Sequence, residues 1–299
     1  MKLSTLAIGA AALPAAQAWG GFGHITVAYI ASNFVSKDTA SFFQGLLRND
    51  TQEYLAGVAT WADSARYSKF YHYSGIFHFI DAKDSPPSYC GIDLERDCKA
   101  DGCVVSAIHN YTTRLLDPAL PVYEHVVASK FLIHFIGDIH QPLHTENVAR
   151  GGNGIHVKFN GVELNLHHVW DTSIAEKLVG HGRRRLGYAE AKNWADTLTH
   201  EINAGKFNTS RDAWLEAVDL VDPTSTALKW ATEGNAYVCT TVLPEGPEAI
   251  VGQELGGDYY EKAAPVIELQ VAKAGYRLAA WLDLIVARIN SQSTEMGDL

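Results

Sequence analysis

Apolar residues recur at three-to-four spacing along most of the chain, which is typical of helices that bury one face. This periodicity predicts helices over Thr26–Phe34, Thr39–Leu47, Val104–Leu116, Tyr123–Gln141, Gly187–Ala204, Arg211–Ala217 and Tyr260–Ile289. Ser36 and Asp38 are candidate caps at the start of the second helix. Pro142 follows the fourth helix and ends it, because proline cannot donate the backbone hydrogen bond that a helix requires.

The last of these segments carries the longest apolar stripe, formed by Ile267, Val271, Ala274, Leu278, Trp281 and Ile285. One segment is different. Ile155–Phe159 and Val162–Leu164 flank the pair Asn160-Gly161, and an Asn-Gly turn between alternating strands is the strongest short signal for a β-hairpin. With no internal repeat and no linker, the pattern predicts a mainly α single domain with a small β-hairpin.

The first 18 residues have the features of a secretory signal. Lys2 precedes an apolar stretch, and Ala16-Gln17-Ala18 fits the small-x-small cleavage rule. A membrane anchor is the alternative, but the stretch is too short to span a bilayer. Cleavage after Ala18 makes Trp19 the first residue of a secreted protein. The functional domain is then expected over residues 19–289, and the polar residues 290–299 are expected to form a disordered tail.

Secretion gives the four cysteines a meaning, because an even number in an oxidising compartment indicates two disulfides. Cys98 and Cys103 flank a short turn-rich loop, which makes a local bridge plausible and leaves Cys90 to pair with Cys239. Zinc binding by thiolates is the alternative, which the irregular spacing and the lack of a C-x-x-C pair disfavour. Glycosylation is also expected at three Asn-x-Ser/Thr triplets, which begin at Asn49, Asn110 and Asn208.

The charge of the chain limits how it can bind nucleic acid. The formal net charge is −10 at pH 7, and removal of Lys2 with the leader makes it −11. An acidic protein cannot hold duplex DNA by neutralising phosphates, which is the interaction that dominates non-specific binding. Any nucleic acid would have to be held through metal ions and through its bases.

Metal-type ligands are concentrated in one part of the chain. His134 and Asp138 are four residues apart, as are His167 and Asp171, so each pair lies on one face of a helix, and His144 lies between the pairs. An isolated pair of this kind is usually a solvated surface pair. These residues lie in an apolar segment, however, where buried histidine and aspartate need partners. Neutral imidazole and carboxylate suit zinc, so the pattern predicts a multi-metal site.

Further candidate ligands lie upstream, at Asp63, His78 and His24. The new amino terminus at Trp19 would add a free amine, which can chelate zinc together with its own carbonyl oxygen. Cleavage of the leader would therefore create a ligand.

These motifs resemble those of the S1/P1 nucleases, a family of zinc-dependent nucleases secreted by fungi and plants. The similarity runs from Trp19 to about Ile285 and lies in Trp19–His24, Trp61–Asp63, His78–Asp81, His134–Asp138, Gln141–His144 and Asn165–Asp171. It includes the cysteines, which that family pairs as Cys90–Cys239 and Cys98–Cys103. The resemblance implies a mainly α-helical fold, similar to that of zinc-dependent phospholipase C, that holds three zinc ions.

By analogy with that family, the three zinc ions share nine ligand residues. The first ion would be held by Asp63, His78, His134 and Asp138, and the second by His144, His167 and Asp171. The third would be held by the amine and carbonyl of Trp19, by His24 and by Asp138 as a bridging ligand.

The resemblance also implies catalytic roles. Asp63 would orient or deprotonate the water that attacks phosphorus as a hydroxide between metal ions. Arg66 and zinc would stabilise the charge that develops on the phosphate oxygens, although Arg66 taken alone is equally well a surface charge. The implied substrates are single-stranded DNA and RNA and mononucleotides, which would be hydrolysed to 5′-phosphate products by endonuclease and 3′-nucleotidase activities.

Substrate contacts are expected from two segments. The ring of Phe79 would stack on a base, Asp81 would accept hydrogen bonds from a base edge, and Gly152 and Asn153 would let a base approach the backbone. Core packing and an ordinary loop are the structural alternatives. Some relatives carry an aromatic residue after the hairpin glycine as a second nucleotide site, but this chain has Val162 there.

The principal alternative is a secreted zinc phospholipase C, which shares the three-zinc site but acts on lipid headgroups. A zinc-scavenging protein without enzymatic activity is a second alternative, and it would need closed metal coordination. We expect a monomer with no obligate protein partner and no membrane association. The sequence does not decide DNA against RNA, base preference, the balance of the two activities, the pH optimum or the occupancy of the glycosylation sites.

Overall fold

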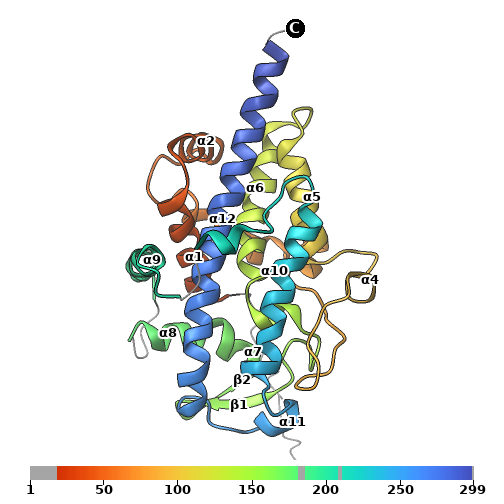
Figure 1. Ribbon diagram of the computed structural model, residues 1–299, viewed down its shortest axis with the longest axis vertical. Coiled ribbons are helices and arrows are strands. Elements are labelled where there is room, and N and C mark those ends of the chain that lie inside the picture. The colour runs from red at the N-terminus through yellow and green to blue at the C-terminus, as the bar shows by residue number, and fades with distance from the viewer. Residues whose placement is uncertain (1–18, 181–185, 208–210, 298–299) are drawn as a thin grey trace, which may run out of the picture.

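The computed structural model of the chain describes residues 19–180, 186–207 and 211–297. The predicted leader and the candidate glycosylation site Asn208 lie outside these residues. Helices make up most of the described chain (Figure 1). The longer ones are α1 (Gly21–Phe34), α2 (Lys37–Leu47), α5 (Val104–Leu116), α6 (Val122–Asp138), α9 (Tyr188–Asn203), α10 (Pro223–Tyr237) and α12 (Asp258–Gly297).

Short helical segments connect the long helices. The short α-helices are α3 (Trp61–Ala65), α4 (Leu94–Asp97), α7 (Leu166–His168), α8 (Ile174–Leu178) and α11 (Pro247–Ile250). The 3₁₀ segments are η1 (Ala56–Val58), η2 (His72–His78), η3 (Pro142–Thr145) and η5 (Arg211–Leu215). Two π-helical turns are η4 (Val169–Ser173) and η6 (Val238–Val242).

Helix α12 runs the length of the molecule, with α1 and α9 on one side and α5 and α10 on the other (Figure 1). Its predicted apolar stripe is fully buried, as the zero exposed fractions of Ile267, Val271, Ala274, Leu278, Trp281 and Ile285 show. Burial of a valine, leucine or isoleucine side chain stabilises the fold by about 1.5–3 kcal/mol. The residue pattern therefore makes α12 the axis around which the other helices pack.

Helix α6 lies inside this arrangement, and all residues from Phe131 to Asp138 are buried. A helix that is buried on every side exposes none of its polar residues to water, so each of them needs a partner in the protein. The helix ends at Asp138, and Pro142 is the first residue of η3. The end of α6 therefore places two polar ligands, His134 and Asp138, in the core.

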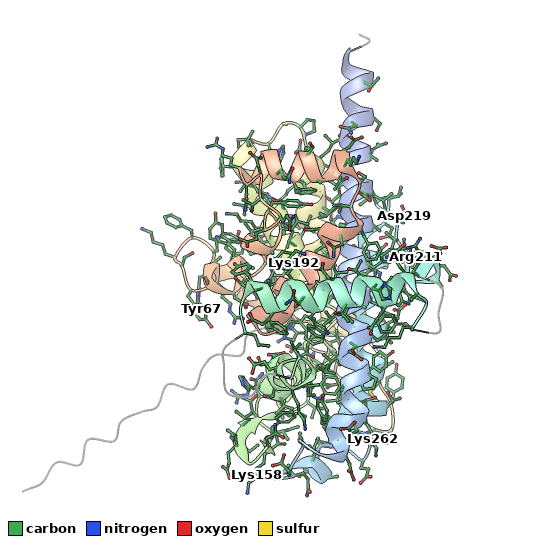
Figure 2. All side chains as sticks on the ribbon, turned by 90° about the vertical axis from the view of Figure 1, so that its left-hand side faces the viewer. Tyr67, Lys158, Lys192, Arg211, Asp219 and Lys262 are labelled. Carbon is green, nitrogen blue, oxygen red and sulfur yellow. A yellow bond between two sulfur atoms is a disulfide. The ribbon has the colours of Figure 1, made fainter. Side chains whose placement is uncertain are left out.

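The hairpin pairs β1 (His156–Phe159) with β2 (Val162–Asn165) in antiparallel register. Asn160 and Gly161 have positive φ angles of 50° and 78°, as the predicted two-residue turn requires. Lys158 lies at this end of the molecule, as does Lys262 of α12, whereas Lys192 lies on α9 (Figure 2).

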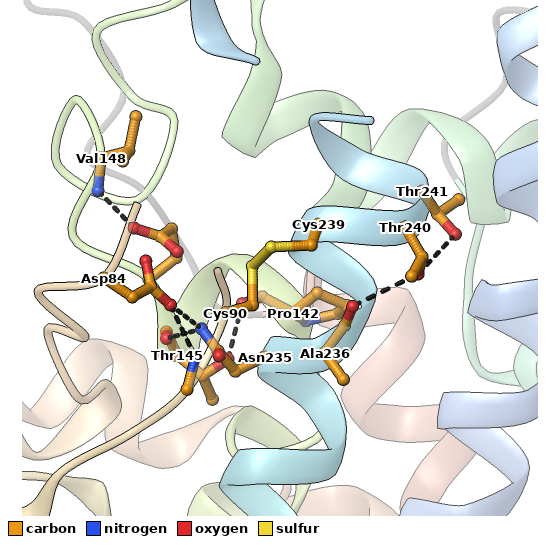
Figure 3. Close-up of a disulfide and its surroundings, with 12 residues drawn as sticks. Asp84, Cys90, Pro142, Thr145, Val148, Asn235, Ala236, Cys239, Thr240 and Thr241 are labelled. Atoms are coloured by element: carbon orange, nitrogen blue, oxygen red, sulfur yellow. Dashed lines mark hydrogen bonds between the residues drawn. A yellow bond between two sulfur atoms is a disulfide. The ribbon is translucent and has the colours of Figure 1, made fainter. Parts of the chain in front are cut away.

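Both predicted disulfides are present, Cys90–Cys239 and Cys98–Cys103. The first joins a long loop to η6, next to α10 (Figure 3). Beside it, Asn235 of α10 donates hydrogen bonds to Asp84 and to the carbonyl of Thr145. This disulfide and its neighbours therefore fix the chain just after the metal-ligand segment that ends at Thr145.

The helix boundaries differ from the predictions in four places. Helix α1 begins five residues earlier than expected, and α6 ends three residues earlier, at Asp138. The expected helix over Arg211–Ala217 is a 3₁₀ segment, and α10 was not predicted at all. Its buried face carries small residues together with a single large Trp230, which gives a weak apolar period.

The tail prediction is wrong as far as Gly297, because α12 continues to that residue. In this part of α12 the hydroxyl of Ser291 donates to the carbonyl of Arg288, and that of Thr294 donates to the carbonyl of Asn290. Among the helices described, none is long and apolar enough to cross a membrane.

Candidate metal centre and adjoining cavity

Asp138 lies at the centre of the candidate site and is fully buried. Its two oxygens face different imidazoles. Oδ1 is 3.1 Å from Nε2 of His24, whereas Oδ2 is 3.0 Å from Nδ1 of His78 and 3.3 Å from Nε2 of His134. A carboxylate in this position can bridge two cations.

Helix α1 brings His24 to this carboxylate. The His24 and His134 rings stack with their centroids 3.8 Å apart, and a Cβ atom at Gly137 would lie 2.8 Å from Nδ1 of His24. Glycine is therefore needed one residue before Asp138. The indole of Trp19 donates from Nε1 to the carbonyl of Gly137 at 2.8 Å, which fixes the start of the described chain beside the same turn.

Helix α3 contributes Asp63, which is 4% exposed. Its Oδ1 lies 3.7 Å from Nε2 of His134 and 3.6 Å from Nη2 of Arg66, one helical turn away. Nδ1 of His134 donates to the carbonyl of Ala59 at 2.7 Å. Because this bond holds the proton on Nδ1, Nε2 is left as the ligand atom.

A second donor group combines η3 and the segment after the hairpin. His144 Nε2 lies 3.8 Å from Oδ1 of Asp171, and His167 Nε2 lies 3.1 Å from Oδ2. Nδ1 of His144 donates to the carbonyl of His78, and Nδ1 of His167 donates to that of Gly151. Asp171 lies in the π-helical turn η4, a kind of distortion that is frequent at functional sites.

The structure brings together eight of the nine predicted ligand residues in three donor groups. The groups are His24, His134 and Asp138; Asp63, His78 and His134; and His144, His167 and Asp171. Within each group the ligand atoms lie within 4.8 Å of one another. Trp19, the ninth, is buried beside the first group through its bond to Gly137.

These groups fit zinc in two respects. Zinc bonds of about 2.0–2.1 Å in a tetrahedron put neighbouring ligand atoms about 3.3 Å apart, close to the separations around Asp138. In addition, several buried ligand atoms have no hydrogen-bond partner within the described chain, including His24 Nε2, Asp63 Oδ1, Asp138 Oδ1, His144 Nε2 and His167 Nε2. Buried polar atoms without partners are rare, and a cation would satisfy all of these.

The pKa values of the candidate ligands depend on burial and on the neighbouring carboxylates. Burial lowers the pKa of His24 and lowers that of His78 to about 4, so both imidazoles are neutral, the form that binds metal. Burial opposes protonation of His134 too, but the carboxylates of Asp138 and Asp63 outweigh it and raise the pKa of His134 to about 9. A proton on His134 supplies the charge that a cation would supply.

A fourth group of possible ligands is excluded by its chemistry. Asp84, Glu146 and Cys90 approach one another, but Cys90 forms the disulfide with Cys239 and has no thiolate. Burial and the neighbouring Asp84 carboxylate raise the pKa of Glu146 to about 8. The Asp84–Glu146 pair therefore carries one proton near neutral pH.

A cavity of about 180 Å³ opens beside the metal ligands. His78, His144 and His167 contribute to one part of its wall, and Arg66 lies in the same wall. Of the predicted substrate contacts, Phe79, Asp81 and Asn153 line it, together with Gly151 in place of Gly152. Its volume suits one planar heterocycle better than a long chain.

Phe79 is held firmly in this wall. Its carbonyl accepts a hydrogen bond from Val104 N–H, and the next residue, Ile80, donates to the carbonyl of His144. These two backbone bonds fix the position of Phe79, which directly follows the candidate ligand His78 in the chain. Asp81 is partly buried and forms an ion pair with Lys99, at 3.3 Å.

The opposite wall is a left-handed turn. Four consecutive residues have positive φ angles, which are 48° at Ala149, 60° at Arg150, 60° at Gly151 and 78° at Gly152. Residues other than glycine disfavour this conformation by about 1–2 kcal/mol each. Such strain is commonly found at functional sites, where the surrounding structure imposes it.

Sequence reasoning missed several members of the site. Arg150 and Glu146 line the cavity, and the carbonyls of Ala59 and Gly151 orient ligand imidazoles. Gln141, known only as part of a motif, donates from Nε2 to Oδ1 of Asp171 at 2.5 Å. A backbone carbonyl that orients a histidine has no side-chain pattern by which it can be predicted. Of these contacts, only that of Gln141 could have been inferred from the sequence.

Comparison with known proteins shows which family has this arrangement of residues. The sequence profile described as S1/P1 Nuclease matches residues 19–287. The chain belongs to the S1/P1 nuclease family. Members of this family are metal-dependent, in agreement with the donor groups around Asp138 and Asp171.

Individual relatives of the S1/P1 nuclease family match over almost their whole length. The chain is 49% identical to nuclease S1 of Aspergillus oryzae over 288 residues, which cover 95% of this chain and 98% of the relative. It is 45% identical to nuclease P1 of Penicillium citrinum, with coverage of 89% and 97%. Endonuclease 4 of Arabidopsis thaliana is 32% identical, with 90% of each chain covered.

Proposed function

We propose that this protein is a secreted, zinc-dependent endonuclease that hydrolyses single-stranded DNA and RNA to 5′-phosphate products and also removes 3′-phosphates from mononucleotides. Membership of the S1/P1 nuclease family supports hydrolysis of phosphodiester bonds. The observation that carries the proposal is that the donor groups adjoin a cavity whose wall includes the ring of Phe79 and the carboxylate of Asp81.

Three zinc ions are proposed from the donor groups. Asp63, His78, His134 and Asp138 would hold one ion, and His144, His167 and Asp171 would hold another. Trp19 and His24, with Asp138, would hold the third, which requires cleavage before Trp19 to expose an amine. Bound zinc supplies Lewis-acid activation of water and of the phosphate oxygens.

The residues of the chain perform the remaining tasks. Asp63 accepts the proton of the attacking water or orients it, because its Oδ1 has no hydrogen bond within the described chain. Arg66, placed 3.6 Å from Asp63, stabilises the charge that grows on the phosphate oxygens during attack. Asp63 lies in α3 and Arg66 caps the end of that helix, so the two groups are close enough to act on one phosphate.

Base binding explains the preference for single strands. A base that stacks on Phe79 inside the cavity cannot remain stacked in a duplex, and stacking contributes about 1–3 kcal/mol without selecting a sequence. Asp81 and Asn153 offer an acceptor and an amide to the base edge. The net charge of −10 gives duplex DNA no electrostatic attraction to compensate.

The phospholipase C alternative is not favoured. The family model that matches the chain is that of S1/P1 nucleases, and the relatives described above are nucleases that match over almost their whole length. The two disulfides support a protein that folds in an oxidising compartment. Export through the leader and action as a monomer are parts of the proposal.

The test is digestion of matched single- and double-stranded DNA and RNA, with and without a chelator, alongside zinc counting by mass spectrometry. We expect chelator-sensitive cleavage of single strands to 5′-phosphate products with about three zinc ions per chain. Asp63→Asn should lose turnover, whereas Asp258→Asn, a change at an exposed aspartate on α12, should not. Intact nucleic acid at full zinc occupancy would contradict the proposal.

A further inference from the structure

A second, larger cavity is lined by residues of η2, α5 and α6 and of the segment before η2. Its volume is about 510 Å³, and aromatic rings make up most of its lining. Three of these rings are far from buried: Phe70 is 71% exposed, Tyr123 is 65% exposed and Tyr73 is 54% exposed. They belong to the segment that follows Tyr67, which lies at the surface of the molecule, and to the start of α6 (Figure 2). A cluster of exposed rings around a hollow marks a binding surface.

The charge of this cavity is balanced. Arg114 and Glu124 are the charged residues that line it in the described chain, and they form an ion pair with each other. Their interaction raises the pKa of Arg114 and lowers that of Glu124, so both remain ionised. A polyanion would have to break this pair to gain a cation. A neutral ligand with many hydroxyl groups could instead hydrogen bond to both partners.

The wall of the cavity also includes Asn110, on the exposed side of α5. Asn110 begins the triplet Asn110-Tyr111-Thr112, an acceptor sequence for N-linked glycosylation. A sugar attached to Asn110 would therefore begin at the cavity wall. Attachment gives the sugar an effective concentration in the millimolar range, so contacts too weak to hold a free sugar would suffice.

We propose that an N-linked glycan on Asn110 packs its first sugar units into this cavity, against the rings of Phe70, Tyr73 and Tyr123. A pyranose ring has an apolar face of C–H groups and a rim of hydroxyls. The C–H face suits the negative face of an aromatic ring, and the hydroxyls suit the Arg114–Glu124 pair. The inference requires that the chain passes through the secretory route, and it does not depend on the nuclease activity.

The position of the glycan links it to the metal site. Helix η2 forms part of the cavity wall through Tyr73 and Phe77 and ends at His78, a candidate ligand of the first metal ion. The ring of Phe77 contacts that of Phe135 in α6, as does the ring of His78. A glycan packed against Tyr73 would therefore reduce the local opening of the segment that ends in His78.

The test combines removal of the glycan with removal of a ring. The full chain is produced in a secreting eukaryotic host as wild type, Asn110→Gln, Tyr123→Ala and the double variant. Glycopeptide mass spectrometry reports whether Asn110 is modified. Thr112→Ser is the matched control, because it keeps the triplet and the hydroxyl that accepts a hydrogen bond from Trp281. Asn49→Gln removes a different acceptor site from the same chain.

We expect amide exchange in residues 70–77 to become severalfold faster in Asn110→Gln and to stay unchanged in Thr112→Ser and Asn49→Gln. Tyr123→Ala should lower the melting temperature of the glycosylated protein and leave that of the Asn110→Gln background unchanged. Phe70→Ala should repeat this non-additive result at a second exposed ring.

Three results would overturn the inference. They are an unmodified Asn110, additive effects of Asn110→Gln and Tyr123→Ala, and amide exchange that does not respond to the glycan. Lys69, which lies over the ring of Phe70, raises the possibility of a nucleic-acid strand in the same place. If Tyr123→Ala raised KM for long single strands but not for dinucleotides, the cavity would serve the substrate and the glycan proposal would be refuted.

Discussion

Gln141 offers the sharpest test of how the second donor group is held. This side chain is fully buried between α6 and η3. Its Nε2 donates to Oδ1 of Asp171, and its Oε1 accepts from Leu143 N–H, both at 2.5 Å. In Gln141→Leu both bonds are lost, and a branched apolar side chain one bond shorter takes the place of the amide. Asp171 is then free to turn away from His144 and His167.

The size of the effect follows from these two bonds. A partner that orients a metal ligand is worth about 10- to 100-fold in metal affinity, which corresponds to about 1.4–2.7 kcal/mol. This range agrees with the value of about 1.5–3 kcal/mol for a hydrogen bond to a charged group. The unsatisfied N–H of Leu143 costs about 1–3 kcal/mol more, but this cost falls on the fold rather than on the metal.

The assay is competitive zinc titration of wild type and variant against a chelator of known affinity, read as occupancy at each total zinc concentration. Gln270→Leu is the matched control. Gln270 is also buried, and its Nε2 donates to the carbonyl of His140 at 2.7 Å, without contact to a ligand carboxylate. We expect Gln141→Leu to weaken one zinc site of three and Gln270→Leu to lower stability alone.

Equal zinc affinities in the two variants would refute this reasoning, because both lose one buried amide donor and only one of them faces Asp171. Loss of all zinc sites together in Gln141→Leu would also refute it. That result would mean that the three donor groups bind zinc as one cooperative unit. It would contradict the idea that Gln141 positions the second donor group alone.

Three further predictions concern the base, the fold and pH. Phe79→Ala should raise KM for dinucleotides about 5- to 150-fold, the equivalent of a lost stacking contact, with a smaller effect on zinc binding; unchanged KM would contradict base stacking. Replacement of Cys90 and Cys239 by serine should lower the free energy of unfolding by about 5 kcal/mol in the chain-entropy model, because the bridge closes a loop of 149 residues. Urea unfolding measures this loss, and a loss below about 1 kcal/mol would contradict the prediction. Burial raises the pKa of Asp97, but its bonds to Arg96 and to backbone N–H groups outweigh this and hold it below 3.8. The folded-state pKa lies below the unfolded one, so Asp97 stabilises the protein above about pH 4 and loses this effect as pH falls further. The stability difference between wild type and Asp97→Asn should therefore shrink as pH falls below about 4.

The elements that sequence alone predicts are those with a strong local signal. The α5 boundaries Val104–Leu116 match the prediction, and the α12 stripe is buried as expected. The Asn160-Gly161 turn is local as well. Helix α10 was missed because its buried positions are mostly alanine, glycine and threonine, whose period is hard to see against a polar background.

The ligand types and their spacing were likewise local signals, but their grouping was not. The order of residues in the sequence does not predict that one oxygen of Asp138 faces His24 and the other faces His78. Backbone carbonyls that orient imidazoles, such as that of Ala59, carry no side-chain signature at all. The positive φ angle of Arg150 is imposed by packing against the propensity of the residue.

The left-handed turn that includes Gly151 makes substrate and metal interdependent. The Gly151 carbonyl accepts a hydrogen bond from Nδ1 of His167, and the same turn provides part of the wall of the cavity beside Phe79. A conformation that costs free energy persists only while its contacts hold it. A metal bound to His167 would therefore be coupled, through this turn, to a ligand bound against the wall. By thermodynamic linkage, a bound nucleotide must then tighten metal binding by the same factor by which the metal tightens the nucleotide. Chelation would therefore weaken recognition of the base as well as prevent cleavage of the strand.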